Sequence, residues 1–171
     1  MWQFTGKQRP SFAQPVGPGQ ESVWDYPRPP VCRPDHRLIT VQYGGRVLAK
    51  STGAVRILET ASPPTVYLPP DDIDLEQLVA GSGNSWCEWK GAATYWSLVT
   101  PEGTIANVGW SYQHPSPTFA SIAGFLSFYP AILDCFVGDE QVRPQPGGFY
   151  GGWVTDEIVG PYKGEPGTSG W

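Results

Sequence analysis

The chain has 171 residues, a length typical of one domain, and its hydrophobic residues, 40% of the total, are numerous enough to form a core. Charged residues make up only 16%, and the chain instead contains 21 glycines, 19 prolines and many aromatic residues, a composition that favours β structure. The net charge of −5 and the scattered lysines and arginines argue against a nucleic-acid partner.

Cysteine usage and hydropathy indicate a cytoplasmic protein. Cys32, Cys87 and Cys135 are too few for a disulfide scaffold, and their odd number argues against secretion. No apolar run follows the first residues, so we expect no signal peptide. No stretch approaches the roughly 20 apolar residues that span a bilayer. We therefore predict a cytoplasmic location and no membrane partner.

Residues 1–22 are expected to form an extended N-terminal arm, and residues 23–171 a single β domain. Regular structure in the arm is prevented by Pro10, Pro15, Gly17, Pro18 and Gly19. The domain begins with an aromatic segment in which Trp24 and Tyr26 could anchor the arm. Aromatic residues more often serve packing alone, and that interpretation is favoured for this segment.

The pattern from residue 38 onward predicts antiparallel strands. Gly44-Gly45 separates two strand-like runs and is a two-residue hairpin signal. In the strand that follows, alternation places Glu59 on the face of Val55 and Ile57, and Arg56 on the opposite face. Glu59 is therefore expected to face the interior or a pocket. Strands are predicted at residues 38–43, 46–50, 54–60, 65–68 (an edge strand), 75–79, 85–90, 92–100 and 104–112, with a final hairpin at 135–143.

One α-helix is predicted from about residue 117 to residue 129. Ser116 is a good N-cap, and Pro117 fits the first helical position. Apolar residues recur at helical spacing over this segment, and Pro130 would end the helix.

Residues 144–171 form a glycine- and aromatic-rich tail, whose glycines let backbone approach other groups closely. We predict that residues 144–153 are ordered, because Phe149, Tyr150 and Trp153 can bury a large apolar area.

The stretch from Ser85 to Lys90 places a thiol, an acid and a base beside two tryptophans. If this stretch is a strand, Trp86, Glu88 and Lys90 share one face. Buried charges require partners, so we expect Glu88 and Lys90 to contact Glu59 and Arg56. Such a cluster is either a structural salt-bridge network or a ligand site, and the residues alone leave both interpretations open.

Three kinds of catalytic or metal chemistry are weakly indicated. Asp72-Ile73-Asp74 has the carboxylate spacing of a nucleotidyl-transfer metal site, but a solvated acidic turn is favoured. Cys87 would be a nucleophile if His114 acted as its base, but a buried structural cysteine is favoured. Zinc needs about four ligands, and Cys32-x-x-x-His36 is the only close pair of suitable residues. We therefore predict no metal and no cofactor.

Five motifs, in order along most of the chain, together resemble the bacterial family called domain of unknown function 427. They are Val23-Trp24-Asp25-Tyr26-Pro27, Arg56-x-x-Glu59-Thr60, Cys87-Glu88-Trp89-Lys90-Gly91, Trp110-Ser111-Tyr112 and Phe128-Tyr129-Pro130. The tail from Pro144 to Trp171 looks like that of a subgroup of this family.

The resemblance implies a mainly β fold related to the β-tent domains, with two antiparallel sheets meeting at an angle. Relatives with this fold include the thalidomide-binding domain of cereblon and the methionine sulfoxide reductase B type. Many β-tent domains hold zinc with two Cys-x-x-Cys pairs, which this chain lacks. A nucleotidyltransferase label is sometimes attached to the family, but the resemblance brings no established activity.

The leading functional hypothesis is a pocket for an unidentified small polar organic molecule, and whether the protein is an enzyme is left open. Aromatic side chains would clasp the ligand and charged ones would orient it. A cation or a nucleobase would stack on Trp110 or Trp96. The alternative is a non-catalytic interaction or homo-oligomeric module, and nucleotidyl transfer is less favoured than either. The candidate ligand-binding residues are Arg56, Glu59, Tyr67, Cys87, Glu88, Lys90, Trp96, Trp110 and Tyr112.

Overall fold

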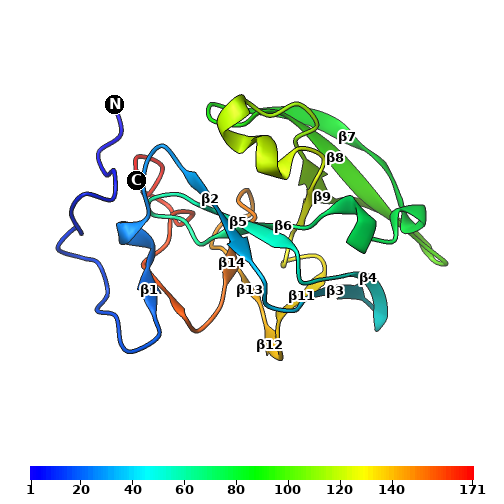
Figure 1. The fold of residues 1–171 in the computed structure, drawn as a ribbon, viewed down its shortest axis with the longest axis horizontal. Coiled ribbons are helices and arrows are strands. Elements are labelled where there is room, and N and C mark those ends of the chain that lie inside the picture. Colours follow the sequence, from blue (N-terminus) through cyan, green and yellow to red (C-terminus); the bar gives the residue numbers. More distant parts are fainter.

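The computed structural model describes residues 1–171 and confirms the mainly β fold class (Figure 1). The sheets are antiparallel, apart from the short parallel pair of β1 and β15. The strands are β1 (Glu21–Ser22), β2 (Val31–Asp35), β3 (Ile39–Tyr43), β4 (Arg46–Ser51), β5 (Ala54–Leu58), β6 (Thr65–Tyr67), β7 (Leu78–Cys87), β8 (Gly91–Thr100), β9 (Gly103–Ser111), β10 (Leu126–Phe128), β11 (Asp134–Val137), β12 (Glu140–Gln141), β13 (Arg143–Pro144), β14 (Trp153–Val154) and β15 (Ile158–Val159). Four short 3-10 segments complete the fold: η1 (Val23–Asp25), η2 (Pro70–Asp72), η3 (Leu75–Gln77) and η4 (Pro117–Ile122).

Three sheets contain most of the strand residues. Two have four strands, in the orders β10-β9-β8-β7 and β12-β11-β3-β4, and the third has the order β2-β5-β6. In Figure 1 the long β7, β8 and β9 lie apart from β3, β4 and β11, with β5 and β6 between them. The largest apolar cluster draws on all three sheets and includes Ile39, Val66 and Phe128, which are almost wholly buried. Apolar strand residues from all three sheets are therefore buried in one shared core.

Turn chemistry fixed the hairpins where the sequence predicted them. Tyr43 pairs with Arg46 around Gly44-Gly45, and Thr100 pairs with Gly103 around the turn Pro101-Glu102. The last hairpin turns at Gly138-Asp139, between β11 and β12. The β6 strand lies at the edge of its sheet, as its flanking prolines indicate.

The predicted helix of residues 117–129 is wrong in type and extent. Only the 3-10 segment Pro117–Ile122 is helical, and Gly124, at φ +75°, reverses the chain. Leu126–Phe128 then forms β10 beside β9, where all three side chains are buried. Apolar residues three or four apart satisfy a 3-10 turn followed by a buried strand as well as they satisfy an α-helix.

The predicted strand of residues 85–90 ends early. The β7 strand stops at Cys87, and the next three residues form the tight turn into β8. Gly91, at φ +96°, allows the chain to reverse there. Glu88 and Lys90 therefore lie in the turn, outside the strand. The prediction that they share one strand face with Trp86 is wrong. The strand predicted from residue 75 begins only at Leu78, because Leu75–Gln77 is η3.

The arm and the tail lie together at one end of the molecule, where both chain ends are found (Figure 1). Phe12 stacks on Trp171 at a ring distance of 5.0 Å, and both rings contact Trp24. Trp153 is buried in the main core, whereas Phe149 is 76% exposed. Tyr150 is also exposed, at 37%, so of the three aromatic residues expected to bury apolar area only Trp153 is a deep anchor. None of the helical segments has the length and apolar character that crossing a membrane requires.

Candidate ligand-binding cavity

An open cavity of about 320 Å³ lies between the end of β5, β6, the β7–β8 turn and β9, and is bordered on its other sides by residues of the arm and the tail. Aromatic side chains dominate its wall, and three cations and two carboxylates are also present. The aromatic lining consists of Trp2, Tyr67, Trp86, Trp89, Tyr95, Trp110, Tyr112, Tyr129, Phe149 and Tyr150, and the charged lining of Arg28, Glu59, Glu88, Lys90 and Lys163.

The deepest wall is a cluster of rings on β6 and β9. Trp110 lies edge-on to Tyr67, with centroids 6.1 Å apart, and 4.6 Å from Tyr129. The Trp110 indole donates a hydrogen bond of 3.1 Å to the Tyr67 hydroxyl, which fixes both rings. Burial raises the pKa values of Tyr67 and Tyr112, so their hydroxyl groups remain protonated at neutral pH. This wall combines apolar area with phenolic hydrogen-bond donors.

Lys90 reaches the cavity from the β7–β8 turn and is only 8% exposed. Its ammonium nitrogen lies 5.5 Å from the Tyr112 ring centre and 6.0 Å from that of Phe119. It forms no salt bridge, since no carboxylate lies within 4.0 Å of it. The Trp89 carbonyl in the same turn accepts a hydrogen bond from Ser116, which holds the turn against the η4 region.

The Lys90 ammonium group remains charged despite this burial. Burial lowers its pKa, but the neighbouring Tyr67, Cys87 and Glu59 side chains raise it by more. The net shift is upward from the ordinary value of 10.5. A charged ammonium with no carboxylate partner therefore faces an aromatic cavity, an arrangement that favours an anionic guest.

Glu59 follows β5 and marks the other charged part of the wall. Its Oε1 atom accepts hydrogen bonds from Arg28 at 3.2 Å and from the Trp89 indole at 3.1 Å. Arg28 also donates to the carbonyl oxygens of Phe4, Thr60 and Trp171. The Arg28 side chain is 2% exposed and saturated by protein acceptors, so its structural task is to tie the arm and the tail to Glu59.

The tail closes the cavity through close backbone contact. A Cβ atom added to Gly151 would lie 2.2 Å from Cη2 of Trp110, so only glycine permits this approach. Lys163, also from the tail, donates to the Trp171 carbonyl at 3.2 Å and lies 4.7 Å from the ring centre of Trp2. Burial, together with repulsion from Arg28, lowers the pKa of Lys163.

The structure brings seven of the nine predicted ligand-binding residues to this cavity and leaves two outside. The seven are Glu59, Tyr67, Cys87, Glu88, Lys90, Trp110 and Tyr112. Arg56 points the other way and pairs with Glu21 at 2.5 Å, so the predicted contact of Glu88 and Lys90 with Arg56 is wrong. Trp96 packs against the main core, and its indole donates to Ser111 at 2.9 Å.

Sequence reasoning missed the cavity residues that come from the two chain ends. Trp2, Arg28 and Lys163 have no local pattern that marks them, and only the fold brings them to Glu59. Tyr95 and Tyr129 had a weak signal. Tyr129 lies within the Phe128-Tyr129-Pro130 motif, and Tyr95 lies on the strand next to Trp110.

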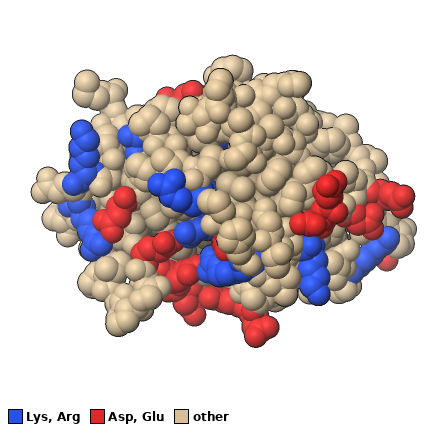
Figure 2. All heavy atoms as spheres, in the orientation of Figure 1, with Lys and Arg blue, Asp and Glu red and all other residues tan.

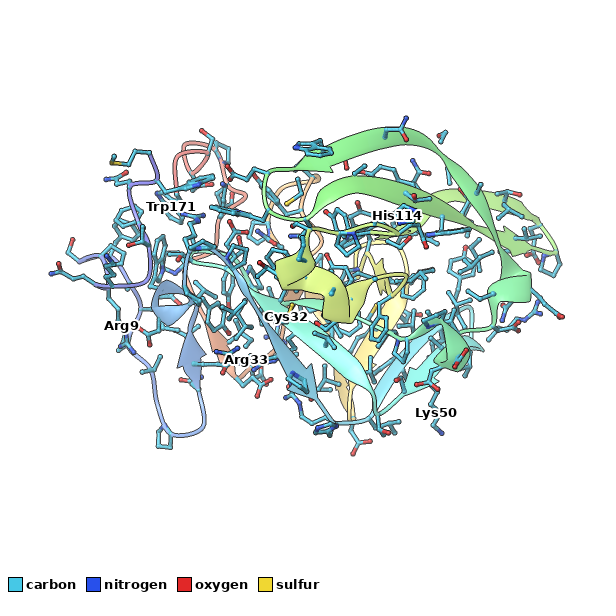
Figure 3. All side chains as sticks on the ribbon, turned by 45° about the horizontal axis from the view of Figure 1, so that its top comes forward. Arg9, Cys32, Arg33, Lys50, His114 and Trp171 are labelled. Atoms are coloured by element: carbon cyan, nitrogen blue, oxygen red, sulfur yellow. The ribbon has the colours of Figure 1, made fainter.

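The residues considered for a metal site or for a catalytic cysteine are not brought together in the structure. No group of three or more His, Cys, Asp or Glu side chains is positioned to hold a metal ion. Asp72 accepts a hydrogen bond of 2.5 Å from Ser51, and Asp74 accepts one of 2.8 Å from Gln77. The two carboxylates thus engage separate neighbours. His114, labelled in Figure 3, is not part of the wall to which Cys87 belongs.

Comparison with known families agrees with the motifs. The family model described as a domain of unknown function, DUF427, with the short name NTP_transf_9, matches residues 31–139. The match covers more than half of the chain, which therefore belongs to this family. No curated protein matches the chain significantly. The cavity is completed by Trp2, Arg28 and the tail residues, which lie outside the matched range.

Proposed function

We propose that the cavity binds a small polar organic molecule. The observation that carries the proposal is Lys90, a buried and charged ammonium group that has no carboxylate partner and opens into an aromatic cavity. A purely structural lysine in such a position would be paired with an acid, since an unpaired buried charge is costly. Glu59 is near enough to raise the pKa of Lys90, yet it pairs with Arg28 instead.

The size and lining of the cavity fit this proposal. A volume of about 320 Å³ is at the lower end of the range of roughly 300–1,000 Å³ found for ligand pockets. Ligand pockets also combine a mostly apolar wall with a few polar groups that orient the ligand. Here the Trp110 and Tyr67 rings supply the wall, and Lys90, Tyr112 and Glu59 supply the polar groups.

Native mass spectrometry of the full chain, purified rapidly from the cells that make it, tests the proposal. We expect a retained small molecule in wild-type protein and its loss in Lys90→Met. The control is Lys50→Met, because Lys50 (labelled in Figure 3) is an exposed lysine on β4 that does not line the cavity. Retention that is equal in wild type and Lys90→Met would contradict the assigned role of Lys90, and no retained molecule in any preparation would count against the proposal.

A second candidate is an interaction or homo-oligomeric module. It is favoured by Trp86 and Phe149, each 76% exposed at the rim of the cavity. Sedimentation analysis tests this candidate: a dimer that Trp86→Ser together with Phe149→Ser converts to monomer would support it. A basic surface for nucleic acid is not part of the proposal, since the basic side chains on the face shown in Figure 2 lie among acidic ones, along its left and lower parts.

A further inference from the structure

The Lys90 end of the cavity has the properties of an anion site. Burial raises the pKa of Tyr112, so its hydroxyl group stays protonated at neutral pH and can donate a hydrogen bond. Lys90 and Tyr112 thus provide two donors, an ammonium and a phenol, beside the same space. The lining as a whole holds three cations against two carboxylates.

The Glu59 end has the opposite character. Both hydrogen bonds that Glu59 receives, from Arg28 and from Trp89, end on the Oε1 atom. The Oε2 atom accepts none from the protein, while the side chain is 25% exposed and lines the cavity. This carboxylate oxygen is therefore free to accept a hydrogen bond from a ligand N–H or O–H group.

Aromatic rings separate these two ends. Trp110, Tyr67 and Tyr129 form a wall of packed rings, which suits a flat unsaturated body better than a flexible hydrated chain. Lys90 and Glu59 stay more than 4.0 Å apart instead of pairing, so a molecule placed between them can meet both.

We propose that the ligand is a small aromatic acid whose carboxylate pairs with Lys90 and Tyr112, and whose N–H or O–H donor at the far end meets Glu59. This inference rests on the proposed function and narrows it to one chemical class. Arg28 does not compete for the acid group, because Glu59 and protein carbonyl oxygens already accept its hydrogen bonds. Lys163 donates to the Trp171 carbonyl and lies over the Trp2 and Tyr150 rings.

Four simple probes test the proposal by isothermal titration calorimetry on the full chain at neutral pH. The probe 4-hydroxybenzoate carries both groups, 4-hydroxybenzamide lacks the charge, 4-methoxybenzoate lacks the donor, and 4-hydroxybenzylamine reverses the charge. We expect 4-hydroxybenzoate to bind at least about tenfold more tightly than the amide, as for other charge-assisted hydrogen bonds. It should bind about threefold or more better than the methoxy compound, and the amine should bind weakest.

Binding of the same four probes to variants shows which residues cause the preferences. Lys90→Met should abolish the preference for acid over amide, and Tyr112→Phe should reduce it. Lys90→Arg should retain it, and Lys50→Met is the matched control. Glu59→Gln should reduce the preference for the hydroxyl over the methoxy compound. Lys90→Gln serves as a second neutral variant, and thermal melts establish that each protein is folded.

The results separate this inference from the proposed function. Equal binding of acid and amide by wild type, or an acid preference that survives in both neutral variants, overturns the aromatic-acid assignment. Failure of all four probes to bind at millimolar concentration also overturns it. In that case a host-derived molecule retained by wild type and lost from Lys90→Met would leave the proposed function standing. If no probe binds and no molecule is retained, both the aromatic-acid assignment and the proposed function are overturned.

Discussion

The two faces of the chain segment around β5 carry charges in contrasting ways. On one face, Arg56 pairs with Glu21 at 2.5 Å and lies 4.0 Å from Asp35. Asp35 also pairs with Arg37 at 2.7 Å, and Arg37 extends the network to Glu157 of the tail. Every charge in this network meets an opposite one.

On the other face, Ile57 and Glu59 line the cavity, where Lys90 has no carboxylate partner. The comparison separates charges that hold the arm, the sheet and the tail together from charges that are available to a guest. Paired charges are costly to break, whereas an unpaired charge costs little to remove and supports ligand binding.

The largest expected effect concerns the aromatic wall, which serves structure even on the cavity face. Trp110 is 7% exposed and packs against Tyr67 and Tyr129. Trp110→Ala should lower the free energy of unfolding by about 3–5 kcal/mol, measured by urea denaturation. Trp86→Ala is the matched control, since the exposed Trp86 should cost within about 0.5 kcal/mol. Similar losses in both variants would show that the wall is not packed as described.

Arg56→Met tests the paired face. The change leaves Glu21 without its cation, but Arg37 still neutralises Asp35. We expect a loss of about 2 kcal/mol, below the 3–5 kcal/mol of a fully buried pair, because Glu21 is partly exposed. Ligand retention should not change. Arg33→Met, on the neighbouring β2, is the control, and loss of ligand in Arg56→Met would refute the separation of the two faces.

The ion pairs of the paired face should also make the stability of the protein depend on pH in the acid range. Burial acts to raise the pKa of Asp35, but hydrogen bonds and charge from Arg37 and Arg56 bring it below the ordinary 3.8. The stabilisation by ionised Asp35 is therefore present above the unfolded pKa and is lost as pH falls through the folded value, below about pH 4. Asp35→Asn should be less stable than wild type at pH 6, by about 1 kcal/mol, and should lose less on acidification.

Urea titrations from pH 6 to pH 3 give the comparison, with Asp139→Asn in the exposed β11–β12 turn as control. Parallel acid limbs for wild type and Asp35→Asn would contradict this assignment.

These contrasts show which parts of the site the sequence can predict. Alternation in residues 54–60 correctly placed Glu59 with Ile57 and away from Arg56. Arg56 was wrongly grouped with Glu59 and Lys90 because Arg56 and Glu59 are close in sequence. Strand alternation, which places them on opposite faces, was the better guide. Lys90 was predicted to face an aromatic pocket, but for the wrong reason, since a turn rather than a strand directs it there.

Other features had no local signal. Arg28 and Lys163 are more than a hundred residues apart, and only the folding of the whole chain brings both to the cavity. The hairpin turns were predictable because Gly-Gly and Pro-Glu-Gly turn sequences act within four residues. The segment after Ser116 was not, because the pairing of Leu126–Phe128 with β9 is a long-range contact that overrides local helical spacing.

Lys90→Met should have the smallest effect on stability and a large effect on binding. No carboxylate loses its partner when Lys90 is removed, and the change places an apolar side chain among the Tyr112 and Phe119 rings. The variant loses the favourable contacts of the ammonium group, but it also no longer buries a desolvated charge. These two effects should nearly cancel, so we expect a free energy of unfolding within about 1 kcal/mol of wild type.

Urea unfolding and ligand retention must be measured on the same preparation, because the contrast between the two is the informative result. A loss of 3–5 kcal/mol, the cost of breaking a buried ion pair, would show that Lys90 belongs to a structural network like that of Arg56. A variant that keeps both its stability and its ligand would make Lys90 an ordinary lysine, and the cavity face would then lack the unpaired charge that distinguishes it from the paired face. The Lys90→Arg variant completes the test, since it retains the charge in a larger side chain and should retain the ligand if charge is what the cavity supplies.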